Sequence, residues 1–195
     1  MSKVLILGAN GGIARVAIDI FLQKTDAHLT LYLRNARRLK HLESDRVRVI
    51  EGNVLNVDEL KAAMVGQDVV YANLAGPLKR MAETIVEAMH ATGLRRLIFI
   101  SSMGIYGEVP GEKYGSILDP YRDSAAVIEA SDLDYTILRP AWFTSADEVD
   151  YETTTKGEPF KGSIVSRKSV ADLVVKLALD PTLDVRQSLG INKPE

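Results

Sequence analysis

The chain has 195 residues, 46% of them hydrophobic and 26% charged, with 24 Lys and Arg against 26 Asp and Glu and a formal net charge of -2. This length fits one ordinary domain rather than two, and the small net charge disfavours nucleic acid and anionic membranes as partners. Cysteine is absent, which excludes disulfides, thiolate metal sites and a cysteine nucleophile.

The start of the sequence lacks the pattern of a secreted or membrane protein. The first apolar run, residues 4–7, is too short for the hydrophobic region of a signal peptide, and no later run is long enough to cross a bilayer. His28, His41 and His90 lack the spacing of metal ligands, so we expect no metal site. We expect a cytoplasmic protein whose chemistry depends on hydroxyls, carboxylates, lysines or a bound cofactor.

Short apolar runs alternate along the chain with segments of helical period. The first run, Val4–Leu7, precedes a glycine-rich turn and a segment in which apolar residues recur at helical spacing from Ile13 to Phe21. Further strands are expected at 29–33, 47–50, 69–74, 97–101 and 135–138, and further helices at 57–65, 78–92, 121–131 and 169–179. This alternation predicts an α/β fold with a doubly wound parallel sheet, the Rossmann fold, and helices on both faces.

We expect this single domain, residues 1–195, to have two portions. Residues 1–140 hold all the predicted strands and form a cofactor-binding body, and residues 141–195 form a small substrate or lid portion. The stretch 144–168 is rich in acidic residues, threonine and glycine, which is typical of a long polar loop. Such loops often bind ligands or cover them.

The turn after the first strand has the composition of a phosphate-binding loop. Gly8, Asn10, Gly11, Gly12 and Ile13 lie in a Gly-x-x-Gly-x-x-Ala pattern between a strand and a helix. Glycines there permit a tight turn and let backbone N–H groups approach a diphosphate at the helix start. We interpret the segment as a dinucleotide-binding turn, with an ordinary glycine-rich turn as the alternative.

Basic residues follow the second strand, where an NAD site usually has a carboxylate. Arg34, Asn35 and Arg37 lie there together with Arg38, and the next acidic residue is Glu43. Guanidinium groups suit the 2′-phosphate of NADP, which a carboxylate would repel. The segment favours NADP as the cofactor, and a solvated basic surface is the alternative.

Seven short segments occur in the order typical of one protein family. They are residues 8–14, 34–35, 51–54, 73–76, 101–107, 133–140 and 166–171. Together they resemble the atypical short-chain dehydrogenase/reductases, and in particular the small NmrA-like NAD(P)-binding proteins. The resemblance extends to about residue 180.

The resemblance implies a set of cofactor-binding residues beyond the glycine turn. Asn53 and Val54 would lie beside the adenine, although Asn53 also suits a turn or helix cap. The loop after the fourth strand would follow the ribose and nicotinamide, or simply lead into a helix at Pro77. That loop comprises Asn73, Leu74, Ala75 and Gly76. Pro140 would lie near the nicotinamide, and Ser101 would also bind the cofactor.

The resemblance also implies where an acceptor would bind. Ser102 would orient a substrate carbonyl, and Met103, Trp142 and Phe143 would contact the substrate, although an aromatic pair is as common in a core. Tyr121 is a candidate general acid with a structural role as the alternative. Family members that use a tyrosine carry a lysine four residues later, which lowers the tyrosine pKa.

Position 125 here is alanine. We therefore expect hydride transfer from NADPH to a small planar or conjugated acceptor, such as a quinone or a flavin, that needs little proton delivery from the protein. One alternative is a non-catalytic NADP-binding, redox-sensing regulator of the NmrA type that acts on a protein partner. Another is a sugar-nucleotide epimerase.

Overall fold

The structure is a computed structural model that describes residues 1–195, and it is built on an eight-stranded sheet of order β3-β2-β1-β4-β5-β6-β10-β8. The strands are β1 (Lys3–Leu7), β2 (His28–Leu33), β3 (Val47–Glu51), β4 (Val69–Ala72), β5 (Arg96–Ile100), β6 (Asp134–Pro140), β8 (Glu152–Thr154) and β10 (Gln187–Asn192). All are parallel except β8, which pairs antiparallel with β10. The predicted doubly wound fold is confirmed.

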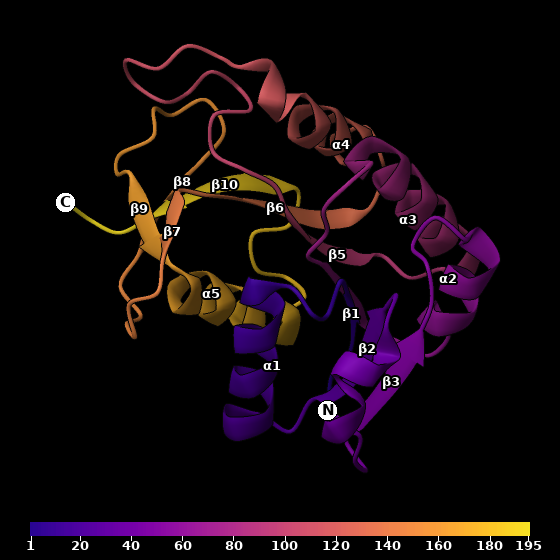
Figure 1. Ribbon diagram of the computed structural model, residues 1–195. Coiled ribbons are helices and arrows are strands. Elements are labelled where there is room, and N and C mark those ends of the chain that lie inside the picture. The colour runs from indigo at the N-terminus through magenta and orange to yellow at the C-terminus, as the bar shows by residue number, and fades with distance from the viewer.

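Helices cover both faces of the sheet, as Figure 1 shows. On one face α1 (Gly12–Lys24) packs against α5 (Arg167–Leu179), and on the other α3 (Leu78–Thr92) lies between α2 (Val57–Met64) and α4 (Asp119–Glu129). Alternate residues of β1 enter the two cores: Val4 and Ile6 pack towards α1 and α5, whereas Leu5 and Leu7 pack towards α2 and α3. Burial on both faces explains the nearly continuous apolar strands.

The chain beyond residue 140 contributes more to this body than we expected. Strand β10 pairs with β6 inside the main sheet, and α5 completes one face of the core. What lies apart is a two-stranded parallel sheet of β7 (Trp142–Thr144) and β9 (Ile164–Ser166) with its loops. The expected boundary at residue 140 therefore does not separate a cofactor-binding body from the rest.

The sequence pattern did not predict β10, because polar residues interrupt its apolar run. Ser188 and Asn192 are buried within it, and both have partners: Arg139 donates to Ser188, and Asn192 donates to Glu152. Gly190 is required by close packing, because a Cβ there would lie 2.4 Å from Thr154 Oγ1.

Short 3-10 turns occur at Ala36–Arg38, Lys40–Leu42 and Ser116–Leu118. None of the helices combines the length and apolar character needed to traverse a bilayer.

Candidate functional site

A cavity of about 600 Å³ opens at the carboxyl ends of β1, β2 and β4. Most residues predicted to bind the cofactor lie on its wall: Gly8, Asn10, Gly11, Arg34, Asn35, Asn53, Val54, Asn73, Leu74 and Ala75. The others predicted for the cofactor lie elsewhere: Gly12, Ile13, Arg37, Gly76, Ser101 and Pro140. Ile13 is buried in the core. Ligands of parallel α/β sheets bind at this edge, so we refer to this space as the dinucleotide cavity.

Close packing explains the glycines of the turn. Gly8 has a φ of +74°, and a Cβ there would lie 2.0 Å from the Asn73 carbonyl oxygen. A Cβ on Gly11 would lie 2.0 Å from Asn73 Nδ2. The Gly11 N–H donates to the Gly8 carbonyl oxygen at 2.9 Å, and α1 starts at the next residue without an acidic group in its first turn. The start of α1 therefore offers free N–H groups and the positive end of a helix dipole.

Two arginines give the dinucleotide cavity a positive wall. Arg34 and Arg38 line it, and neither makes an ion pair or a side-chain hydrogen bond. Arg37, the other arginine of the predicted basic segment, is off the wall because the chain forms a tight 3-10 turn over Ala36–Arg38. Glu51 stabilises this turn by accepting a hydrogen bond from the Ala36 N–H at 3.0 Å.

Tyr32, which the sequence analysis missed, lies on the same wall. Its hydroxyl donates to the Asn53 carbonyl oxygen at 3.1 Å, and burial, followed by the charge of Glu59, raises the pKa of Tyr32 to about 12. A Cβ on Gly52 would lie 2.3 Å from that hydroxyl. The tyrosine thus packs directly on a backbone that has no room for a side chain. An aromatic residue near the end of the second strand was the only signal in the sequence.

Asn53 has the turn role that we kept as an alternative. Its Oδ1 accepts from the Leu55 N–H at 3.0 Å, and its own N–H donates to Glu59 at 3.1 Å. The side-chain oxygen is therefore occupied within the protein, while Nδ2 makes no hydrogen bond. Asn10 is held similarly, since its Oδ1 accepts two hydrogen bonds from Arg15.

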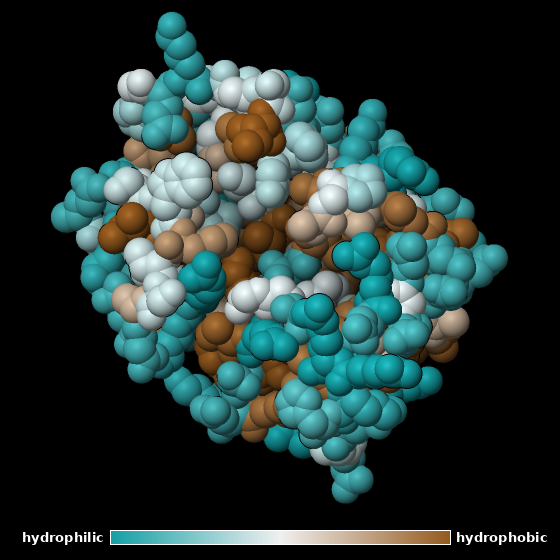
Figure 2. Space-filling view, in the orientation of Figure 1, coloured by the Kyte–Doolittle hydropathy of each residue, from teal (hydrophilic) through white to brown (hydrophobic).

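A second cavity of about 440 Å³ lies along the same edge of the sheet, at the ends of β5 and β6. Ser101, Ser102, Met103, Tyr121, Pro140, Trp142 and Phe143 all line it. Most of its remaining wall comes from the loop 104–118, which the sequence analysis did not assign to the site. Figure 2 shows apolar residues gathered around a hollow near the centre of this face. We refer to this space as the acceptor cavity.

The polar side chains on the wall of the acceptor cavity are those of two serines, two tyrosines, Glu112 and Lys113, beside the Trp142 indole. The Ser102 hydroxyl donates to the Met103 carbonyl oxygen at 3.1 Å, and the Tyr121 hydroxyl makes no hydrogen bond within the protein. No lysine follows Tyr121 on α4, and Lys113 reaches the cavity instead from the loop. Trp142 is 69% exposed and Phe143 42% exposed, so both form the wall of a cavity and not a core.

A buried ion pair fixes the loop that carries Ser102 and Met103. Glu108 accepts hydrogen bonds from the Gly104 and Tyr106 N–H groups, both at 2.9 Å, and pairs with Arg139 at 2.5 Å. The side chains of Arg139 and Glu108 are 0% and 6% exposed. Arg139 also stacks on the Tyr106 ring and donates to Ser188. Strands β6 and β10 thereby hold the loop in place.

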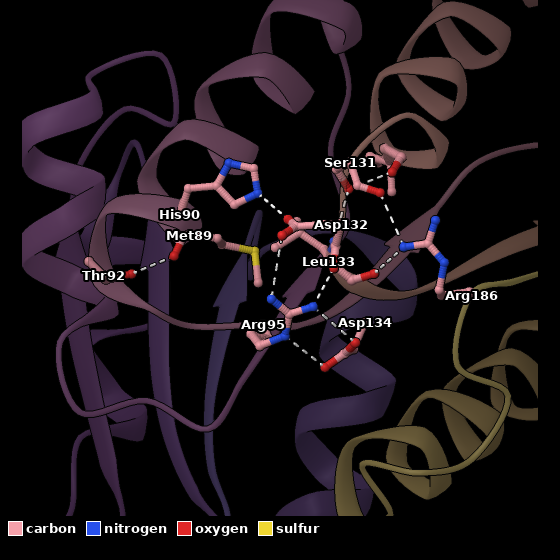
Figure 3. Close-up of polar contacts among 10 residues, drawn as sticks. Met89, His90, Thr92, Arg95, Ser131, Asp132, Leu133, Asp134 and Arg186 are labelled. Atoms are coloured by element: carbon pink, nitrogen blue, oxygen red, sulfur yellow. Dashed lines mark hydrogen bonds and ion pairs between the residues drawn. The ribbon is translucent and has the colours of Figure 1, made fainter.

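The opposite edge of the sheet has a separate polar network, drawn in Figure 3. Arg95 pairs with Asp132 and Asp134, and His90 contacts Asp132 at 2.6 Å. All four side chains are substantially exposed. These pairs fasten the end of α3 and the start of β5 to the segment before β6. Arg95 is thus engaged within the protein, as expected for a residue at the amino end of a strand.

The residues of the dinucleotide cavity fit a pyridine dinucleotide, because a cradle without Cβ atoms adjoins a helix start and two unpaired arginines. The profile of the NAD(P)H-binding family matches residues 8–181. The chain belongs to the NAD(P)H-binding family. A sheet of this order, with helices on both faces, is the fold that such proteins use for the cofactor.

Two solved structures resemble this chain over 99% or more of its length, and a further protein resembles it over 89%. A Rossmann-fold NAD(P)-binding protein from Shigella flexneri is 46% identical, with a TM-score of 0.90 over 100% of this chain and 94% of that one. A short-chain dehydrogenase/reductase from Veillonella parvula, solved in complex with NADP, is 32% identical, with a TM-score of 0.89 over 99% and 95%. A Bacillus subtilis protein, named as an uncharacterized sugar epimerase, is 24% identical over 89% of this chain and 86% of its own. These likenesses support the predicted affiliation with the atypical short-chain dehydrogenase/reductases.

Proposed function

We propose that the protein is an NADP-dependent reductase that acts on a small planar or conjugated acceptor such as a quinone or a flavin. The observation that carries the proposal is the pair of cavities along one edge of the sheet. One has a glycine cradle and unpaired arginines, and the other is largely apolar with Ser102 on its wall. When bound, NADPH supplies the hydride, and the protein supplies orientation and exclusion of water.

The preference for NADP rests on Arg34 and Arg38. Both guanidinium groups line the dinucleotide cavity without a carboxylate partner, so they are available to a 2′-phosphate. Glu51 is the nearby acidic residue, and it is hydrogen-bonded to the backbone of the turn. The Veillonella relative that was solved with NADP supports the same choice.

We infer the class of acceptor from the residues that line the acceptor cavity. Met103, Val109, Leu118, Trp142 and Phe143 offer apolar surface to a flat ring system. Ser102 would orient a carbonyl oxygen of the acceptor once its hydroxyl turns away from the Met103 carbonyl oxygen, to which it donates in the structure. Tyr121 has no lysine beside it on α4, which favours acceptors that take up a proton from water after reduction.

A redox-sensing regulator without turnover is the competing proposal, and one pair of assays separates it from a reductase. Binding of NADPH and NADH is measured by calorimetry, and oxidation of NADPH is then followed at 340 nm with a panel of quinones and flavins. Turnover with any acceptor supports the reductase, while tight NADPH binding without turnover on the whole panel favours the regulator. A sugar-nucleotide epimerase would instead act on a nucleotide sugar with no net oxidation of NADPH.

Two substitutions test the cofactor assignment. We expect NADPH to bind more tightly than NADH, and Arg34→Ala to narrow that difference. Equal affinities in the wild type would contradict the preference for NADP. Gly11→Val should abolish binding of both cofactors, because its Cβ would occupy the space of the Asn73 side chain. Unchanged affinity in this variant would refute the assignment of the turn.

A further inference from the structure

Arg167 links the two cavities, although it lies on the wall of neither. It is the first residue of α5, and its side chain extends to the start of α1, where a Cβ on Gly12 would lie 3.3 Å from the Arg167 Nε. Its guanidinium carbon also lies 5.3 Å from the centre of the Phe143 ring. One side chain therefore touches both the glycine turn and the wall of the acceptor cavity.

The charge of Arg167 has no partner in the protein. Three lysines of the same part of the chain are paired: Lys168 with Asp147, Lys176 with Asp172, and Lys193 with Glu148. Arg167 has no carboxylate within 4.0 Å and uses only Nη1, which approaches Ser145 Oγ at 3.3 Å and the Thr144 carbonyl oxygen at 3.5 Å. Nε and Nη2 remain free to donate. A partly buried guanidinium with two free donors is suited to bind an anion in bidentate fashion.

We propose that Arg167 binds the diphosphate of the dinucleotide beside the glycine turn. The free N–H groups of α1 and the guanidinium would then both donate to the diphosphate, and both interactions are electrostatically favourable. This inference rests on the proposed function, since it requires a dinucleotide at the Gly8–Gly12 turn. Stacking of the same guanidinium on Phe143 would align one wall of the acceptor cavity with the bound cofactor.

The test compares Arg167→Met with Lys168→Met, which removes a neighbouring charge that is already paired with Asp147. Affinities for NADP, NAD and adenosine 2′-monophosphate are measured by calorimetry. Arg167→Met should weaken NADP and NAD alike, by about tenfold, because each loses one charge-assisted contact to a shared diphosphate. Adenosine 2′-monophosphate, which has no diphosphate, should bind as it does to the wild type. Arg34→Ala should show the opposite pattern, with NADP and adenosine 2′-monophosphate weakened and NAD spared.

Further measurements separate this role from a structural one. Thermal unfolding checks that each variant is folded, and Arg167→Lys, which retains the charge without the fork, should fall between the wild type and Arg167→Met. Unchanged NADP and NAD affinities in folded Arg167→Met would overturn the inference and leave the proposed function intact. A rise in the acceptor KM alone would also overturn it, and would assign the guanidinium to an acidic group of the acceptor. Failure of the wild type to bind either dinucleotide would refute the proposed function itself.

Discussion

Replacement of Glu108 by alanine should both destabilise the fold and disorganise the acceptor cavity. The substitution removes the carboxylate that pairs with the fully buried Arg139 guanidinium. It also removes the acceptor of the Gly104 and Tyr106 N–H groups. Three donors, two backbone N–H groups and the guanidinium, thereby lose the acceptor that they share, and the loop that follows Ser102 loses its ion pair with β6.

The expected loss of stability can be estimated from the burial of the ion pair. Breaking a buried ion pair by removing one partner costs about 3–5 kcal/mol, because the remaining charge is left uncompensated. Unfolding of a chain of 195 residues carries an entropy of about 0.4 kcal/mol per kelvin. The expected fall in Tm is therefore about 7–12 °C. Such a loss is a large part of the roughly 5–15 kcal/mol by which natural domains are stable.

Denaturation in urea and differential scanning calorimetry measure the effect, and two controls locate its cause. Asp147→Ala breaks an ion pair whose acid is 88% exposed and should leave Tm essentially unchanged. Glu108→Leu combined with Arg139→Leu removes both charges and should be more stable than Glu108→Ala alone. If Glu108→Ala had no more effect than Asp147→Ala, the ion pair would not hold the loop and our reasoning would be wrong.

Three further predictions concern other parts of the molecule. Tyr71→Phe should leave the free energy of unfolding unchanged or raise it by about 1 kcal/mol, since the Tyr71 hydroxyl is buried without a partner. Tyr32→Phe should lower the free energy of unfolding, because it removes a hydrogen bond. An equal loss of stability in the two variants would contradict this prediction. Gly52→Ala should lower the free energy of unfolding by about 1–3 kcal/mol and weaken NADPH binding, because the new Cβ would collide with the Tyr32 ring. Gly115→Ala should change neither quantity, because the nearest atom to its new Cβ lies 3.9 Å away. His90 and Arg95 hold the pKa of Asp132 below its ordinary value of 3.8, so its charged form stabilises the fold above that pH and this contribution is lost as the pH falls through the lowered pKa. Asp132→Asn should flatten the decline of Tm below about pH 4, and identical acid profiles would show that the network of Figure 3 contributes nothing.

The fold was predictable where the hydrophobic pattern is local. The runs that became β1, β2, β4, β5 and β6 are buried on both faces, the edge strand β3 is partly exposed, and helical periods separate these runs. Strand β10 was missed because Ser188 and Asn192 replace apolar residues within it and find their partners on distant parts of the chain. Burial of a polar residue depends on a partner that only the folded structure reveals.

The sequence predicted those parts of the candidate site that lie on short turns directly after a strand. The Gly8 to Gly11 segment and the loop from Asn73 to Ala75 lie on one cavity, because the carboxyl ends of the neighbouring parallel strands β1 and β4 meet at the same edge of the sheet. Of the arginines in the predicted basic segment, Arg34 and Arg38 line the cavity and Arg37 does not, since a 3-10 turn follows β2. Lys113 and the rest of the 104–118 loop could not be placed, because Glu108 and Arg139 fix this loop through contacts far apart in sequence.

The geometry of α4 explains the absence of a catalytic lysine. Ala125, four residues after Tyr121, is fully buried in the apolar core between α4 and α3 and is not on the cavity wall. A lysine at that position would lie in an apolar core, where its charge would be strongly disfavoured, so the helix does not permit the tyrosine and lysine arrangement. Lys113 reaches the cavity only from an exposed part of the loop. The reductase that we propose would orient its acceptor through Ser102, and it would suit acceptors whose reduction does not depend on an acid held by the protein.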